Sequence, residues 1–265
     1  MKKKTLGIII VSVLGAAAIF CSAMFTHQYL DAKNSKSAFD DLTNLITEID
    51  EPQKDTEAEE SDLSAEELAA AEAALAREKY AALFVQNNDL IGWIKIDGTN
   101  VNYPVMQTPN KPDFYLKRSF DKTYSDYGVP YIDEACITGI SNNLVIYGHH
   151  MNDGSMFNVI SDTTDQATFD SMDYVYYITR DATYKLRPLA TKVVEDTYAK
   201  ARTPNFEGDD GLKNYLSEML DGASAVASDA TDRAASATKV VTLVTCRSLS
   251  FSNTRAVMVL TPVEE

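Results

Sequence analysis

The feature that most constrains the fold is a series of short segments rich in Val, Ile, Tyr and Thr in the second two thirds of the chain. Such residues favour strands, and turn residues such as Asp97-Gly98 separate neighbouring segments. Helical patterns interrupt the series at 155–160 and 211–220, and the Ala- and Ser-rich stretch 223–237 is interpreted as a mobile connection. Roughly eight short strands with few helices predict a closed or nearly closed β-barrel. The predicted strands cover residues 91–96, 101–106, 129–132, 144–147, 174–179, 184–194, 240–245 and 256–260.

The amino end follows a different pattern. Three lysines at positions 2–4 precede residues 6–25, a run of 20 residues without a charge. At about 1.5 Å per residue, a helix of this length spans the roughly 30 Å hydrocarbon layer of a bilayer. Lysines before a span favour a cytoplasmic amino end, so we expect residues 1–5 in the cytoplasm and a membrane anchor over 6–26. A cleaved signal peptide is the alternative, and with either one the remainder is exported.

Two further segments are expected between the anchor and the strands. Residues 27–62 are interpreted as an acidic extracellular spacer, because acidic residues concentrate around 48–60 without aromatic residues or helical apolar spacing. Residues 63–87 are predicted to form a helix. Ser64 is a suitable N-cap, and Glu67 completes a capping box with it. Residues 88–265 are then the barrel domain.

Charge and cysteine content exclude several classes of protein. The net charge is −15, which is the wrong sign for a protein that binds nucleic acid along its phosphates. Three cysteines cannot support a disulfide-rich scaffold, and no Cys-x₂-Cys pair suggests zinc. Cys136 is interpreted as an incidental thiol. A Cys136–Cys246 disulfide is conceivable in an oxidising space, but it would disable any thiolate chemistry.

The residues that carry chemistry stand where predicted strands end. The strand before Gly148 is followed by His149 and His150, the strand 240–245 is followed by Cys246, and Arg255 begins the next strand. A thiolate is a nucleophile, an imidazole can donate or accept a proton near neutral pH, and a guanidinium can stabilise an oxyanion. Taken singly, each also has a structural explanation: a core thiol, a structural histidine or a surface charge.

Four motifs in the same order give the chain a resemblance to the class B sortases. The segment ending at Cys246, Thr-Leu-Val-Thr-Cys, matches the TLxTC signature of sortases, and the histidine segment resembles the class B pattern Tyr-Gly-His-His-Met. The barrel entry at 88–107 and the segment 113–116 are also similar to the class B sequences. The resemblance covers residues 80–262.

The resemblance implies an eight-stranded sortase barrel that acts as a membrane-anchored cysteine transpeptidase on a Gram-positive surface. It identifies Cys246 as the nucleophile, His149 as the general acid and base, and Arg255 as the group that stabilises the oxyanion or positions the substrate. His150 is given no catalytic role. No cofactor is implied, and no metal either, since nothing reproduces the acidic calcium loop of class A sortases.

The expected partners are surface proteins with a carboxy-terminal sorting signal, which is cleaved after Thr, and an amine of peptidoglycan or of a cell-wall precursor. The expected location is the cell membrane, crossed once, with the catalytic domain outside. Three alternatives remain: a sortase that polymerises pilins, a cysteine peptidase that only hydrolyses, and a tethered binding module without turnover.

Overall fold

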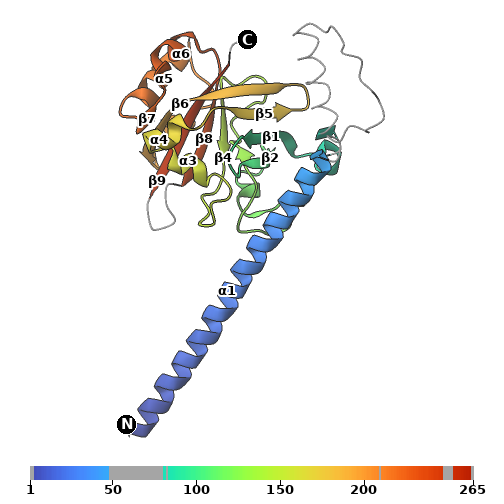
Figure 1. Cartoon of the computed structure of the whole chain (residues 1–265), viewed down its shortest axis with the longest axis vertical. Helices are drawn as coiled ribbons and strands as arrows, with labels where there is room; N and C mark the ends of the chain where they lie inside the picture. The colour runs from blue at the N-terminus through green and yellow to red at the C-terminus, as the bar shows by residue number, and fades with distance from the viewer. Residues whose placement is uncertain (1–2, 48–79, 82, 209, 247–252, 264–265) are drawn as a thin grey trace. The chain divides into compact units, whose positions relative to one another are not determined.

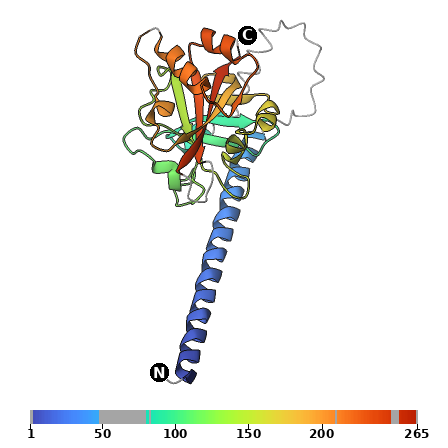
Figure 2. The ribbon, with the colours of Figure 1, turned by 90° about the vertical axis from the view of Figure 1, so that its left-hand side faces the viewer.

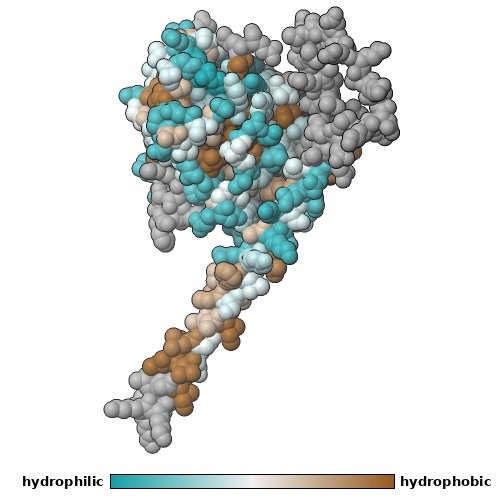
Figure 3. Space-filling view, viewed as in Figure 1, coloured by the Kyte–Doolittle hydropathy of each residue, from teal (hydrophilic) through white to brown (hydrophobic). Residues whose placement is uncertain are grey.

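The computed structural model describes residues 3–47, 80–81, 83–208, 210–246 and 253–263 (Figure 1). Contacts divide the chain into two units, Met1–Asp41 and Leu42–Glu265. The first unit is helical, and its helix α1, Lys3–Thr47, extends past the boundary at Asp41. Within α1, Ile8–Leu45 is long and apolar enough to cross a membrane, and the apolar side chains of residues 8–30 are exposed (Figure 3). The helix continues well beyond residue 26, into the first part of the segment predicted as a spacer.

Most of the predicted helix 63–87 and the acidic part of the predicted spacer, 48–62, lie outside the described residues. The end of that helix is described: residues 80–81 and 83–86 are helical. Tyr80 packs against Trp93 with the two ring centroids 5.5 Å apart, and Leu83 is fully buried. This helical end therefore packs against the strands that follow it.

The second unit contains the barrel predicted from the strand pattern. Eight strands pair in the order β5-β1-β2-β3-β4-β8-β9-β6, and an additional β5–β6 pairing closes the ring. The two-residue strand β7 lies outside the ring, on β6. The prediction of an eight-stranded barrel is confirmed. The strands are β1 Leu90–Ile96, β2 Asn102–Met106, β3 Tyr131–Ile132, β4 Asn143–Tyr147, β5 Val175–Thr179, β6 Thr183–Glu195, β7 Ala225–Val226, β8 Val240–Cys246 and β9 Thr254–Pro262.

Apolar side chains from neighbouring strands fill the core. Ile94, Val145, Leu243 and Val259 have no exposed surface. Burial of such side chains stabilises a fold by about 1.5–3 kcal/mol each. The longest contacts in the ring are those of β9 with β6 and β8, which run side by side (Figure 2). These three strands carry much of the site described below.

Short helices cover the connections between strands. The helix predicted at 211–220 is present with those bounds, whereas the one predicted at 155–160 begins later, as α3. Four short helical elements, η1, α4, η2 and α6, have no counterpart in the sequence prediction. The helical elements of the barrel unit are η1 Phe114–Lys117, α3 Asn158–Asp162, α4 Gln166–Asp170, η2 Ala199–Arg202, α5 Gly211–Leu220 and α6 Ala230–Ser236.

The interpretation of residues 223–237 as a mobile connection is wrong, because the stretch contains β7 and α6. Arg233 of α6 donates to the backbone carbonyls of Arg187 and Pro188, at 2.8 and 2.9 Å, and to the hydroxyl of Thr261. It also pairs with Asp229 at 3.1 Å. Small Ala side chains let α6 lie close to the barrel, and this one long side chain ties it to β6 and β9. The composition of residues 223–237 shows the small side chains, but it does not show the hydrogen bonds by which Arg233 holds α6 on the barrel.

Candidate active site

Strand directions bring four chain segments to one rim of the barrel. β4 and β8 are parallel, with Tyr147 opposite Val244, so Gly148 and Cys246 leave the barrel on the same side. β9 is antiparallel to β8 and therefore begins there. β6 is antiparallel to β9 and therefore ends there. The topology explains why residues about 100 positions apart, 149 and 246, reach one rim.

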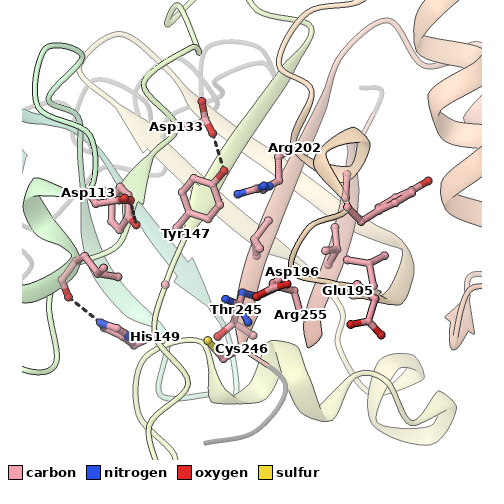
Figure 4. A pocket seen from close by; sticks show the side chains of 18 of the residues that line it. Asp113, Asp133, Tyr147, His149, Glu195, Asp196, Arg202, Thr245, Cys246 and Arg255 are labelled. Atoms are coloured by element: carbon pink, nitrogen blue, oxygen red, sulfur yellow. Dashed lines mark hydrogen bonds between the residues drawn. The ribbon is translucent and has the colours of Figure 1, made fainter. Parts of the chain in front are cut away.

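A cavity of about 320 Å³ opens at this rim, and the candidate residues predicted from the sequence line it together (Figure 4). His149 comes from the exit of β4, Cys246 from the end of β8, and Arg255 from the start of β9. Cys246 and Arg255 are direct partners in the β8–β9 ladder. A thiol, an imidazole and a guanidinium thus share one opening to solvent.

Cys246 carries a free, partly exposed thiol. The Cys136 thiol is also free, but it is buried: burial raises its pKa to about 11, and its Sγ donates to the carbonyl of Asn143 at 3.5 Å. Asn143 pairs with Val240 at the opposite end of β8. The Cys136 Sγ also accepts from the backbone N–H of Val145, which pairs with Thr242. Cys136 thus lies beside a part of β8 four to six residues from Cys246, about 13–20 Å along the strand, whereas a disulfide needs Cα atoms within about 7 Å. A Cys136–Cys246 disulfide is therefore incompatible with the fold.

Local packing positions His149. A Cβ added at Gly148 would lie 2.5 Å from the ring of the buried Phe157, so a glycine is required there. The backbone N–H of Phe157 donates to the carbonyl of His149 at 2.8 Å. The His149 Nε2 lies 2.7 Å from the carbonyl oxygen of Leu116. A carbonyl can only accept, so Nε2 carries a hydrogen and Nδ1 is the nitrogen that can gain or lose a proton.

We expect NMR of the ¹⁵N-histidine protein to show neutral His149 with its proton on Nε2 and a pKa below the ordinary value of about 6.5. Burial disfavours the imidazolium form and lowers the pKa, and the Leu116 carbonyl opposes this only in part. His149 should therefore stay neutral at pH 7 and gain its proton only as the pH falls. A long-range ¹H–¹⁵N titration measures both properties. A proton on Nδ1, or a pKa above the ordinary value, would contradict this assignment.

Arg255 projects from β9 beside the thiol. It is half-buried, and its Nη1 donates to the carbonyl of Thr254 at 3.2 Å. This bond uses one of five donor hydrogens, so the remainder of the guanidinium can meet a substrate oxygen.

His150 turns away from the cavity. Its Nε2 lies 3.1 Å from the side-chain amide of Asn158, which also donates to the carbonyl of Met151. His150 does not line the cavity that His149 lines. His149 and His150 are adjacent in the sequence, but their side chains have different surroundings.

Thr242, the first Thr of the Thr-Leu-Val-Thr-Cys segment, has a structural role. Thr242 is fully buried, donates to the Asn143 side chain at 2.7 Å and lies 3.1 Å from the Tyr215 hydroxyl. It links β8 to β4 and to α5. This bond network holds the strand whose end bears Cys246.

Other residues of the cavity were not identified from the sequence. Tyr131 and Tyr147 donate to Asp113 and Asp133, each at 2.6 Å, and burial raises the pKa of both tyrosines well above the usual range. Their sequence segments carry no spacing that would reveal this pairing, because loops bring them together. The remaining polar residues of the cavity are Glu134, Glu195, Asp196, Tyr198, Arg202 and Thr245.

Comparisons with known proteins agree with one another. A family model described as "Sortase domain" matches residues 94–263. Sortase B of Staphylococcus aureus is 26% identical over 190 residues, which is 71% of this chain and 75% of that protein. The structure of the Staphylococcus aureus sortase B–substrate complex superposes with a TM-score of 0.68 at 21% identity, covering 90% of this chain and 99% of that one. A structure of sortase B complexed with triglycine gives a TM-score of 0.69 at 22% identity, covering 88% and 99%.

Proposed function

The chain belongs to the sortase family as a class B cysteine transpeptidase, and from this premise we propose that it joins surface proteins to the cell wall. In the proposed reaction it cleaves a carboxy-terminal sorting signal after Thr and transfers the new carboxyl end to an amine of peptidoglycan or of a cell-wall precursor. The observation that carries the proposal is the single cavity shared by His149, Cys246 and Arg255.

The first half-reaction forms a thioester. Neutral His149 takes the proton of the Cys246 thiol as the sulfur attacks the carbonyl carbon of the substrate Thr. The negative charge moves to the carbonyl oxygen, where the Arg255 guanidinium stabilises it. The C–N bond then breaks, and protonated His149 gives its proton to the departing amine. The product is an acyl group on the Cys246 sulfur.

The second half-reaction releases the thiolate. An acceptor amine attacks the thioester carbon, and neutral His149 accepts the proton that the amine loses. The C–S bond breaks and a new amide bond remains. His149 must be neutral for this half, which agrees with a pKa held below its ordinary value by burial.

Helix α1 supports the proposal of a membrane anchor. Its apolar segment is exposed, and three lysines precede it, which favours a cytoplasmic amino end. A sortase anchored over 6–26, with the barrel outside the cell, would meet substrates held in the same membrane at a raised effective concentration. A cleaved signal peptide would instead leave a mature chain that begins after the apolar run.

Product analysis tests the proposal against its alternatives. The full chain in detergent is incubated with sorting peptides, with and without a small amine, and the products are identified by mass spectrometry. We expect an amide product that forms at the expense of the hydrolysed product as amine is added. Hydrolysis alone, unaffected by amine, would identify a peptidase. A preference for a lysine of another protein would identify a pilin-polymerising sortase.

Arg255→Lys should lower kcat/KM for thioester formation by about 10²-fold, the effect of losing one oxyanion donor. A lysine keeps the charge but loses the planar fork that can bond an oxyanion and stay bound to the Thr254 carbonyl. The initial rate of release of the carboxy-terminal fragment measures the effect. Arg187→Lys, on an exposed part of β6 where Arg187 pairs with Asp229, is the matched control. Equal rates for the Arg255 variant and the control would reject the proposed role.

A further inference from the structure

The walls of the active-site cavity carry more negative than positive charge. Two guanidinium groups, of Arg202 and Arg255, face a larger set of carboxylates. This excess has no part in the two half-reactions described above. The carboxylates are those of Asp113, Asp133, Glu134, Glu195 and Asp196.

Two of these acids already have hydrogen-bond donors. Asp113 and Asp133 accept from the hydroxyls of Tyr131 and Tyr147. These two acids stand on the β4 side of the cavity, and their pairing fixes the wall there. Asp113 and Asp133 are therefore less available to a ligand than the other acids of the cavity.

Glu195 and Asp196 stand on the other side, at the end of β6. Glu195 pairs with Thr254 in the β6–β9 ladder, and the backbone N–H of Asp196 donates to the carbonyl of Asn253 at 2.6 Å. Among the residues that the structure describes, no ion pair or side-chain hydrogen bond engages either carboxylate. The hydrogen bond of the Arg255 guanidinium goes to the Thr254 carbonyl and not to these acids.

Thr245 supplies an independent observation at the same place. Its side chain is 2% exposed, its Oγ1 has no hydrogen-bond partner within the described part of the chain, and it lines this cavity beside Cys246. A buried hydroxyl without a partner destabilises a fold, because it has lost its hydrogen bonds to water. A ligand group that donates a hydrogen bond would remove this cost. Figure 4 shows Thr245 with Cys246, Arg255 and Asp196 at one end of the cavity.

We propose that Asp196 and Thr245 bind a primary ammonium group of a substrate, with Glu195 adding negative charge to the same cavity. An ammonium group offers three donors and a positive charge, which suit a carboxylate and a hydroxyl that accept and a cavity with excess negative charge. A neutral group would leave the carboxylates unpaired, and an anion would be repelled. The inference rests on the proposed transpeptidase function. Two substrate groups have this chemistry: the acceptor amine, and a lysine side chain within the sorting signal.

A direct binding measurement tests the site without any turnover. Nα-acetyl-lysinamide is titrated into the full chain in detergent, and the backbone amides of Thr245 and Asp196 are followed by NMR. We expect both to shift with this probe, and the shifts to be lost with its Nε-acetyl derivative, which has the same length and no charge. Equal shifts with both probes, or none, would overturn the proposal.

Variants then identify the source of the ammonium group. Asp196→Asn and Thr245→Val are compared with Asp173→Asn, an exposed acid outside the cavity. A charge-assisted hydrogen bond contributes enough to predict a rise in KM of about tenfold for Asp196→Asn. If KM rises only for a donor peptide that contains lysine, and not for its acetyl-lysine analogue, the ammonium group in the site is that of the donor lysine. If KM rises only for the amine substrate, and hydrolysis is unaffected, the ammonium group in the site is that of the acceptor. Both results support the proposal.

The same assay separates this proposal from a role through Arg255. If Asp196 only positions that guanidinium, hydrolysis of the acetyl-lysine donor without amine will fall in kcat, with no change in selectivity between charged and uncharged substrates. That result overturns the ammonium site. Turnover by the unaltered chain in the same experiment reports on the transpeptidase function itself, so the failure of one proposal is distinguishable from the failure of the other.

Discussion

Cys246→Ala is expected to abolish both cleavage and transfer, leaving no acyl adduct. The proposed chemistry passes entirely through this sulfur, and the described part of the cavity wall holds no second thiol, because Cys136 does not line the cavity. Loss of a covalent nucleophile costs several orders of magnitude in rate, about 10⁶ where it has been measured in serine enzymes. Release of the carboxy-terminal fragment, followed by chromatography, measures the loss.

Cys136→Ala is the matched control for that experiment. It removes a buried thiol of low acidity whose partners are backbone atoms of Asn143 and Val145. We expect a modest loss of stability and turnover close to that of the unaltered chain. If Cys246→Ala retained turnover, or if Cys136→Ala abolished it in a folded protein, the assignment of the nucleophile would be wrong.

His149→Ala is expected to lower kcat/KM for transfer by about 10²–10⁴-fold, the range for loss of a positioned acid–base group. The loss should appear in both half-reactions, because the same imidazole gives and takes the proton. Its remaining activity should lose the acid limb of the pH–rate profile, which arises where neutral His149 gains a proton at a pH below its ordinary pKa. Steady-state rates from about pH 5 to about pH 9, with and without amine, measure all three effects.

The adjacent histidine provides the comparison. His150→Ala removes a ring held by Asn158 outside the cavity, so it should affect stability more than the chemical step. Thermal unfolding and activity are measured on both variants. If His150→Ala were the more damaging to the rate in a folded protein, the choice between the two imidazoles would have to be reversed.

The strands of the barrel were predictable because each has a local signal. Segments such as 240–245 and 184–194 contain β-branched and aromatic residues over the length of a strand, and the structure places strands there. The candidates His149, Cys246 and Arg255 were also visible in the sequence, since each stands at a strand end. Spacing alone only suggested their convergence at one rim, which follows from the parallel β4–β8 and antiparallel β8–β9 pairings.

The rest of the site depends on contacts between distant segments. Asp133 and Tyr147 meet across the β3–β4 connection, and Asp196 reaches the cavity from the end of β6. No spacing in the sequence distinguishes these acids from the many others of a chain with a net charge of −15. The stretch 223–237 was misjudged for a related reason: its order comes from Arg233, whose partners lie on β6 and β9.

The most direct test of the central claim is the mass of the intact chain after brief exposure to a sorting peptide. The account predicts a mass increase equal to the peptide up to its Thr, located by peptide mapping on Cys246 and discharged by an added amine. Acylation of a different residue, or cleavage of the peptide with no adduct on Cys246 at any time, would contradict it.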